Sequence, residues 1–310
     1  MTAAALCVVT CQRPVGLARL LESVAGLDVP DALSLRLVVV DNDTEGSARE
    51  VVETARTGLR WPLTYRVEPE RGIPFARNRA VALARESGAD FVVFVDDDQE
   101  VPAGWLSELL KVQAATRADV VSCPCIARFE SPVPDWIRAG RFFDHAPPFA
   151  TGEDVPYNYA RTSGVLVAAE LFAGDAPFDA AYAFSGGSDR HFFHRASLDG
   201  RRIVWAAEAV IYEYVPPTRA TAGWLIRRAH RTGNSRSLTM VDLEGTPLRR
   251  LKRFGGGLRA VLSGVWRTVA AIPRGRAAVL RGVQRLAYGI GLITGVLGIR
   301  AREYRVIHGS

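Results

Sequence analysis

Residues 91–98 read FVVFVDDD, five apolar residues followed by three consecutive aspartates, Asp96, Asp97 and Asp98. An apolar run rich in β-branched and aromatic residues is typical of a strand buried on both faces of a sheet. Three carboxylates at the end of such a strand repel one another, and bound Mg²⁺ or Mn²⁺ would relieve that repulsion. The stretch therefore predicts a metal site at the end of a central strand. The alternative is a solvated turn that caps a helix starting near residue 102.

Strands and helices are predicted to alternate upstream of this stretch. The hydrophobic pattern predicts strands at 5–10, 35–40 and 64–67, and helices at 14–26, 50–58 and 75–87. This alternation indicates an α/β fold with a mostly parallel sheet and flanking helices. Since parallel strands end at one edge of a sheet, the polar segments 10–13, 41–43 and 96–98 should line one crevice.

The chain has 310 residues, of which 48% are hydrophobic and 23% are charged. This composition is that of a folded globular protein. The four cysteines lack the CxxC spacing of zinc and redox sites, which indicates reduced thiols in a cytosolic protein. They are Cys7, Cys11, Cys123 and Cys125. The short N-terminal apolar segment has no basic start, and we expect it to be a strand and not a signal peptide.

Charge divides the chain near the turn residues 245–247. Residues 245–310 contain 13 Lys and Arg and one acid, a net charge of +12, whereas 1–244 contain 26 bases and 32 acids, a net charge of −6. We therefore expect a body, 1–245, and a basic helical tail, 246–310.

The predicted crevice offers the groups that a nucleoside diphosphate requires. Asp41 can accept a hydrogen bond from a base, and a metal ion on Asp98 can bridge two phosphates. Arg71 or Arg77 can neutralise the remaining charge. No GxGxxG follows the first predicted strand and no GxxxxGK[ST] occurs, which disfavours dinucleotide and P-loop sites.

Six segments occur in an order that resembles the family 2 glycosyltransferases, over roughly residues 5–236. They are VVTCQRP, LVVVDNDT, RGIPFARNRAVALA, FVVFVDDDQEVPAGWL, FSGGSDRHFFHRASLDGRRIVW and VPPTRATAGWLIRRAHRTGNS. The resemblance implies a GT-A fold, which is Rossmann-like, with a nucleotide-sugar half at about 1–100 and an acceptor half at about 101–245. It also implies a metal-dependent inverting glycosyltransferase of the hexosyltransferase type that uses a nucleotide-diphosphate sugar, expected to be a UDP-sugar.

The resemblance assigns roles to particular residues. It places Asp98 as the direct ligand of Mg²⁺ or Mn²⁺. Asp96 is a second metal residue, expected to lie nearer the ribose or a water bound to the metal. Glu213 stands where relatives often have a histidine ligand, and is the third. The residues matched to the donor site are Thr10, Arg13, Asp41, Arg71, Gly72, Arg77, Asn78, Asp96 and Asp97. Alternatively, Asp41 forms an Asx turn, and Arg77 and Asn78 pair on a helix surface.

The segment GGSD at 186–189 is the second predicted chemical site. The family usually has Glu-Asp here, at the start of a helix, and this chain has Ser188 followed by Asp189. The resemblance makes Asp189 the general base that deprotonates the acceptor hydroxyl. The alternative is a helix N-cap. His191 and His194 lie on the same helix, and we expect a packed pair because no third ligand accompanies them.

The basic tail is expected to contact a membrane. The uncharged stretch 286–299 has 14 residues, fewer than the ~20 that span a bilayer. Arg281 and Arg285 precede it and Arg300 and Arg302 follow it, which suits a helix lying on an anionic membrane surface. We expect a cytoplasmic protein attached peripherally to the cytoplasmic face of the cell membrane. The alternative is a helical hairpin that packs on the body or forms a dimer.

Two further segments are expected to complete the site. The basic segment 224–236 either closes over the pyrophosphate or is a solvated helix, and the aromatic region 126–163 either shapes the acceptor site or belongs to the core. The expected partners are a nucleotide-sugar donor and a glycan or lipid-linked acceptor, in polysaccharide or glycolipid synthesis. Nucleic acid is not expected, since no reader module is present. The alternatives are a nucleotidyltransferase, or a non-catalytic sugar-nucleotide-binding membrane scaffold.

Overall fold

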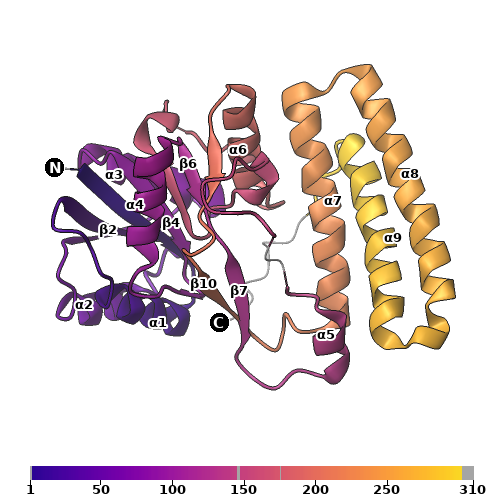
Figure 1. Cartoon of the computed structure of the whole chain (residues 1–310), viewed down its shortest axis with the longest axis horizontal. Helices are drawn as coiled ribbons and strands as arrows, with labels where there is room; N and C mark the ends of the chain where they lie inside the picture. Colours follow the sequence, from indigo (N-terminus) through magenta and orange to yellow (C-terminus); the bar gives the residue numbers. More distant parts are fainter. Residues whose placement is uncertain (1, 145–146, 175, 302–310) are drawn as a thin grey trace.

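The computed structural model describes residues 2–144, 147–174 and 176–301. The final part of the predicted tail, 302–310 with Arg302, lies outside the described residues. Figure 1 shows an α/β body that contains the sheets and, beside it, a group of long helices formed by the C-terminal third of the chain.

A seven-stranded sheet forms the centre of the body, in the order β3-β2-β1-β4-β8-β6-β9. Its strands are β1 (Thr2–Thr10), β2 (Leu33–Asp41), β3 (Leu63–Val67), β4 (Phe91–Asp96), β6 (Val120–Ser122), β8 (Val165–Ala168) and β9 (Ile203–Trp205). All neighbouring strands are parallel except β8, which is antiparallel to both β4 and β6. The predicted mostly parallel α/β fold is therefore confirmed.

Helices cover both faces of this sheet. One face packs against α1 (Pro14–Ala25), α2 (Arg49–Arg56) and α4 (Trp105–Thr116), and the other against α3 (Ile73–Glu86) and α6 (Ser188–Leu198). In α1 the buried residues recur every three or four positions, which places one apolar stripe on the sheet. In α3 the buried residues are mainly alanines, so this helix lies close to β1 and β2. Short 3₁₀ helices at Tyr157–Tyr159, Ala169–Leu171, Ala180–Tyr182 and Ile272–Arg274 complete the connections.

The strand ends meet as the sequence predicted. Thr10 pairs with Asp41 at the end of β1 and β2, and Val9 pairs with Asp96 at the end of β4. These carboxylates therefore lie at one edge of the sheet, where open α/β folds bind their ligands.

A second, three-stranded sheet extends this edge, with β10 (Ile211–Val215) between β5 (Gln99–Glu100) and β7 (Cys125–Phe129). Glu213 lies opposite Gln99, and the backbone N–H of Tyr214 donates to the carbonyl of Asp98 at 2.8 Å. This pairing brings Glu213 beside the three aspartates, although more than a hundred residues separate them in the chain.

The long helices α7 (Ala222–Glu244), α8 (Pro247–Ala270) and α9 (Arg276–Val296) form the C-terminal bundle. The predicted break at 245–247 separates α7 from α8. However, α9 lies between α7 and α8 (Figure 1), so α7 and the tail form one packed unit. Most of the uncharged segment 286–299 belongs to α9, which packs between the other two helices. The expected contact of this segment with a membrane stays a prediction. No described helix is long and apolar enough to cross a membrane.

Aromatic side chains join the bundle to the body. Phe143 stacks on Trp224 of α7, with ring centroids 5.9 Å apart. Arg281 of α9 donates to the carbonyl of Gly140, at the end of α5 (Asp135–Gly140), at 2.8 Å. Part of the aromatic region 126–163 thus belongs to the core between bundle and body. All four cysteines are free, as predicted.

Candidate active site

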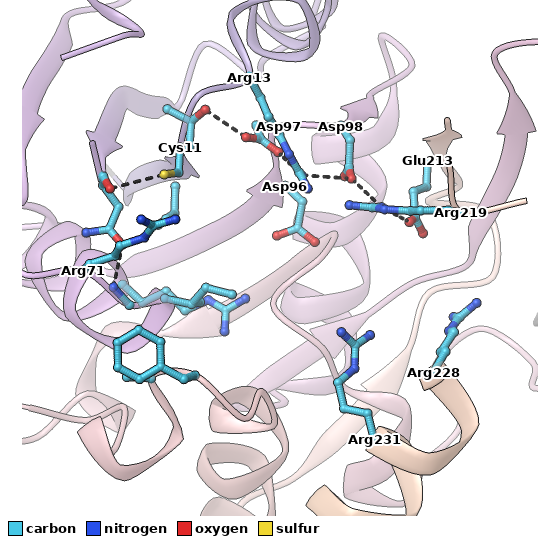
Figure 2. A pocket seen from close by; sticks show the side chains of 18 of the residues that line it. Cys11, Arg13, Arg71, Asp96, Asp97, Asp98, Glu213, Arg219, Arg228 and Arg231 are labelled. Atoms are coloured by element: carbon cyan, nitrogen blue, oxygen red, sulfur yellow. Dashed lines mark hydrogen bonds and ion pairs between the residues drawn. The ribbon is translucent and has the colours of Figure 1, made fainter. Parts of the chain in front are cut away.

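A cavity of about 300 Å³ opens at the carboxyl ends of β1 and β4. Charged side chains from distant parts of the chain line it. They are the carboxylates Asp96, Asp97, Asp98 and Glu213 and the arginines Arg13, Arg71, Arg77, Arg219, Arg228 and Arg231. Figure 2 shows that Arg228 and Arg231 reach the cavity from the opposite side to the acids.

Alternating acids and arginines form a row along one wall (Figure 2). Arg13 Nη1 lies 3.0 Å from Asp97 Oδ1 and 3.3 Å from Asp98 Oδ2. Arg219 Nη1 lies 2.9 Å from Asp98 Oδ2 and 3.2 Å from Glu213 Oε1. We call these five side chains the acid–arginine row. Each arginine bridges two carboxylates, so the row holds the acids in place at the cavity wall.

Three residues predicted to bind the donor also belong to this supporting network. Thr10 Oγ1 donates to Asp97 Oδ2 at 2.8 Å, and Asp97 is almost fully buried. Thr10, Arg13 and Asp97 line the cavity. Arg13, which Asp97 holds, also contacts Asp98 and so helps to position it.

Asp96 differs from the other acids of the cavity. Among the described residues, no side chain donates a hydrogen bond to its carboxylate, which hangs below the row in Figure 2. Burial and the nearby charge of Asp98 raise the pKa of Asp96 to about 8. Burial raises the pKa of Asp97 to about 6, against the opposing effect of Arg13, and burial together with Asp98 raises the pKa of Glu213. The two arginines of the row thus contact three of the four carboxylates, and Asp96 is left without an ion pair among the described residues.

The predicted metal ligands Asp96, Asp98 and Glu213 all line the cavity. Within residues 2–144, 147–174 and 176–301, however, no three Asp, Glu, His or Cys side chains are arranged to hold a metal ion. The physical reason is Arg219, which lies between Asp98 and Glu213 and occupies both. The predicted three-ligand set is thus not assembled in this structure.

Asp41 lies fully buried at the end of β2, behind the cavity wall. Its Oδ2 accepts from the backbone N–H of Ala48 at 2.8 Å and from the Tyr65 hydroxyl at 3.0 Å. Its Oδ1 is buried and has no partner among the described residues. Burial raises the pKa of Asp41. An unpaired buried acceptor costs free energy, and Asp41 itself is not among the residues that line the cavity.

Asn42 holds the loop that carries Arg71, a role that sequence reasoning missed. Its side-chain amide donates to the carbonyls of Glu68 and Glu70 at 2.9 and 2.8 Å and accepts from the N–H of Gly72 at 2.8 Å. Gly72 has a φ of 145°, and a Cβ there would lie 2.8 Å from the Cβ of Ala183. Glycine is therefore required at this position of the cavity wall.

Arg77 and Asn78, adjacent in α3, have different roles. Arg77 lines the cavity and its Nη1 donates to Ser188 Oγ at 3.0 Å. Asn78 does not line the cavity, because its amide bonds to the backbone N–H and carbonyl of Phe178, both at 2.9 Å. The prediction that Asn78 contacts the donor is replaced by a structural role between α3 and the segment before α6.

Asp189 stands in the first turn of α6, next to the buried Ser188 that Arg77 holds. Gly187 precedes this helix with a φ of 95°, and a Cβ there would lie 2.8 Å from Ser235 of α7. The Asp189 side chain is half-buried, lies outside the set that lines the cavity, and has no hydrogen-bond or ion-pair partner among the described residues. No side-chain cap is formed at this N-terminus, so the N-cap alternative is not observed.

The two histidines of α6 pack as expected. His194 stacks on Tyr157 with centroids 4.1 Å apart, and its Nε2 lies 3.0 Å from Glu244. His191 packs against Tyr182. Both are buried, and burial lowers the pKa of each. Neither histidine reaches the cavity.

Two arginines of the segment 224–236, Arg228 and Arg231, line the cavity from α7. Closure of this segment over a pyrophosphate stays a prediction. Arg219 was missed, although it lies in the segment PPTRATAGW that contributed to the family resemblance. No local pattern distinguishes Arg219 from other surface arginines, because its role depends on the pairing of β10 with β5.

Comparison with known proteins agrees with this geometry. The pattern of the family described as "Glycosyl transferase family 2" matches residues 5–170. The succinoglycan biosynthesis protein ExoM of Rhizobium meliloti (strain 1021) is 33% identical over 297 residues, which cover 96% of this chain and 93% of that protein.

Two solved structures share the fold. One is S. aureus TarS 1–349 in complex with UDP, with a TM-score of 0.52 and 18% identity over 100% of this chain and 95% of that chain. The other is the mannosyltransferase PcManGT from Pyrobaculum calidifontis in complex with GDP-Man and Mn²⁺, with a TM-score of 0.56 and 20% identity over 95% and 87%.

Proposed function

The chain belongs to glycosyltransferase family 2, and from this membership we propose that it transfers a sugar from a UDP-sugar to an acceptor hydroxyl, with inversion, in polysaccharide synthesis. Glycosyltransferase activity follows from the family. The role in polysaccharide synthesis is supported by the relative named for succinoglycan biosynthesis, which matches nearly the whole chain.

One observation carries the proposal, namely the charge arrangement of the cavity. The acids occupy one wall, and Arg228 and Arg231 face them from the other (Figure 2). A nucleoside diphosphate with a divalent cation has matching charges, since the arginines suit the phosphates and the acids suit the cation.

The residues present fit Mg²⁺ or Mn²⁺ in their chemistry. The Asp96 carboxylate has no hydrogen-bond donor among the described side chains, and burial and the nearby charge of Asp98 raise its pKa, so a bound cation would favour its charged form. Asp96 and Asp98 would hold the ion, with Glu213 nearby. When bound, such an ion stabilises the charge that develops on the departing diphosphate. The Mn²⁺ named with the mannosyltransferase of similar fold supports the assignment.

The choice of a uracil base is supported by Asp41 and by TarS. The buried Oδ1 of Asp41 is an acceptor that lacks a donor among the described residues, and the N–H of a uracil ring would supply one. TarS is described in complex with UDP and with UDP-GlcNAc. The GDP-Man of PcManGT makes GDP the competing donor base.

Asp189 is proposed as the general base. Its carboxylate takes the proton of the acceptor hydroxyl as that oxygen attacks the anomeric carbon, and the bond to the diphosphate oxygen breaks on the opposite face. The site's support for this role is the position of Asp189 beside Ser188, which Arg77 ties to the cavity. Arg228 and Arg231 face the negative charge of the leaving diphosphate.

A nucleotide screen tests the proposal. Thermal unfolding should be measured with UDP, GDP, UDP-sugars and GDP-mannose, each with and without Mn²⁺. We expect UDP compounds to raise the melting temperature in the presence of Mn²⁺, with a shift that grows with ligand concentration. A shift with GDP compounds alone would show that the donor base is guanine and not uracil. No shift with any nucleotide would contradict the proposed donor site.

A further inference from the structure

Helix α8 carries its large apolar side chains on the side that faces away from the molecule. Leu251 is 68% exposed, Leu262 61% and Trp266 72%. The other members of this set are Leu248, Phe254, Leu258, Val265 and Val269. They recur every three or four residues over the length of the helix, so they form one continuous apolar stripe. Figure 1 shows α8 as the outermost helix of the bundle.

The inward side of α8 is formed instead by small residues. Gly257, Ala260 and Gly264 are its buried positions. A Cβ at Gly257 would lie 2.7 Å from the Ile293 side chain of α9, and one at Gly289 of α9 would lie 2.7 Å from the backbone of Val261. The two helices therefore pack backbone to backbone, and α8 does not use its large apolar residues to stabilise the bundle. A water-soluble helix normally has the reverse arrangement.

Basic side chains border the apolar stripe. Exposed Arg250 lies beside one edge of the stripe, and exposed Lys252 and Arg259 lie beside the other. None of these three bases has an acidic partner among the described residues. Neither α8 nor α9 contains an Asp or Glu.

We propose that α8 docks on an anionic phospholipid surface, with its apolar stripe in the headgroup–acyl boundary and the bordering bases Arg250, Lys252 and Arg259 on lipid phosphates. An outward apolar stripe bordered by Lys and Arg is the arrangement of an interfacial helix. Trp266 is suited to this boundary, since its ring is apolar and its N–H can stay hydrated.

Charge favours a lipid surface over a second copy of the chain. Two copies joined through α8 would bring together two helices that carry only positive charges, whereas anionic headgroups neutralise them. The proposal does not depend on the proposed function, because no residue of α8 lines the active-site cavity.

Vesicle flotation tests the proposal with the full-length chain. Vesicles of phosphatidylcholine and phosphatidylglycerol in equal parts should carry the protein, and vesicles of phosphatidylcholine alone should carry much less. Leu251→Glu/Leu262→Glu should weaken binding by about tenfold or more, because two inserted side chains become charged. The matched control, Val15→Glu/Leu198→Glu, changes two exposed apolar residues outside the bundle and should float like the wild type.

Two further measurements make the outcome specific. Trp266 fluorescence, taken as the difference between the wild type and Trp266→Phe, should shift to shorter wavelength with anionic vesicles. Lys252→Gln/Arg259→Gln should reduce flotation with the anionic vesicles. Equal flotation of the Leu251→Glu/Leu262→Glu variant and the wild type would overturn the proposal. A wild-type dimer that this variant dissociates, without vesicle binding by either, would assign the stripe to a second copy and also overturn it.

Discussion

The Asp96 carboxylate has no hydrogen-bond or ion-pair partner among the described residues, and it is buried close to Asp98. A carboxyl group whose pKa is higher in the folded protein than in the unfolded chain destabilises the fold above its unfolded pKa of about 4. For Asp96 the full cost is reached above its folded pKa of about 8. A cation bound beside Asp96 would offset this cost, because it stabilises the charged carboxylate.

We predict that removing the Asp96 charge stabilises the folded protein at high pH. In metal-free protein above pH 8, Asp96→Asn should raise the free energy of unfolding by roughly 1–3 kcal/mol, and near pH 4 this gain should vanish. Urea unfolding with a chelator at both pH values measures it. The exposed control Glu86→Gln should change the free energy by less than about 0.5 kcal/mol. A destabilised Asp96→Asn protein at the higher pH would show that the cluster is already neutralised.

A second prediction concerns Asp189. Asp189→Asn should lower kcat by about 10²- to 10⁴-fold with little change in donor affinity, since the amide cannot accept the acceptor's proton. Rapid-quench turnover and donor titration measure the two quantities. Asp199→Asn, just beyond the other end of the same helix, is the matched control. Unchanged kcat in the Asp189 variant would require another base.

Sequence reasoning identified residues whose chemistry shows in a local motif. Asp41, Asp96 and Asp98 follow apolar strands, and the structure brings their strand ends together. Arg219 and Asn42 escaped notice because their partners lie in other elements. Tertiary pairing, which local sequence does not encode, gives them their positions.

At the scale of elements, glycines explain the bundle. The glycines of α9 reduce intrinsic helix propensity, yet the helix forms because they let α7 and α8 approach closely. Gly291 faces the carbonyl of His230 in α7, and Gly282 faces Thr268 in α8. The sequence showed an uncharged segment bordered by arginines but not its packing partners. For this reason it suggested a membrane-facing role for the helix that is packed at the centre of the bundle.

The third prediction compares two glycines of α8. Gly264→Ala should lower the free energy of unfolding by about 1–3 kcal/mol, because its Cβ would meet the backbone of Leu286. Gly255→Ala has nothing within 4 Å of its Cβ and should raise stability by about 0.5–1 kcal/mol. Denaturant unfolding of both variants checks the pair. Equal effects would mean that α8 and α9 are not in close contact.

At the scale of the whole molecule, the bundle and the active site share α7. Arg228 and Arg231 line the cavity from α7, while further along Asn234 bonds to Thr294 of α9 at 3.0 Å and to the carbonyl of Ile299 at 2.7 Å. The composition shift at 245–247, where a boundary between body and tail was expected, coincides with the turn between α7 and α8. It did not reveal that α7 packs with the basic segment that follows it.

The fourth prediction tests this dependence. A chain that ends after residue 245 should lose the packing of α9 on α7 and therefore bind UDP at least about tenfold more weakly. Donor titration and helix content from circular dichroism measure the effect. Full donor affinity in the shortened chain would show that α7 holds its arginines without the bundle.

The central claim is that the cavity binds a nucleoside diphosphate together with a divalent cation held by Asp96 and Asp98. The most direct measurement is a calorimetric titration of UDP into the wild type and into Asp96→Asn, each with and without Mn²⁺. We predict that Mn²⁺ strengthens UDP binding to the wild type and has little effect in the variant. UDP binding that is the same in all four titrations would contradict the claim.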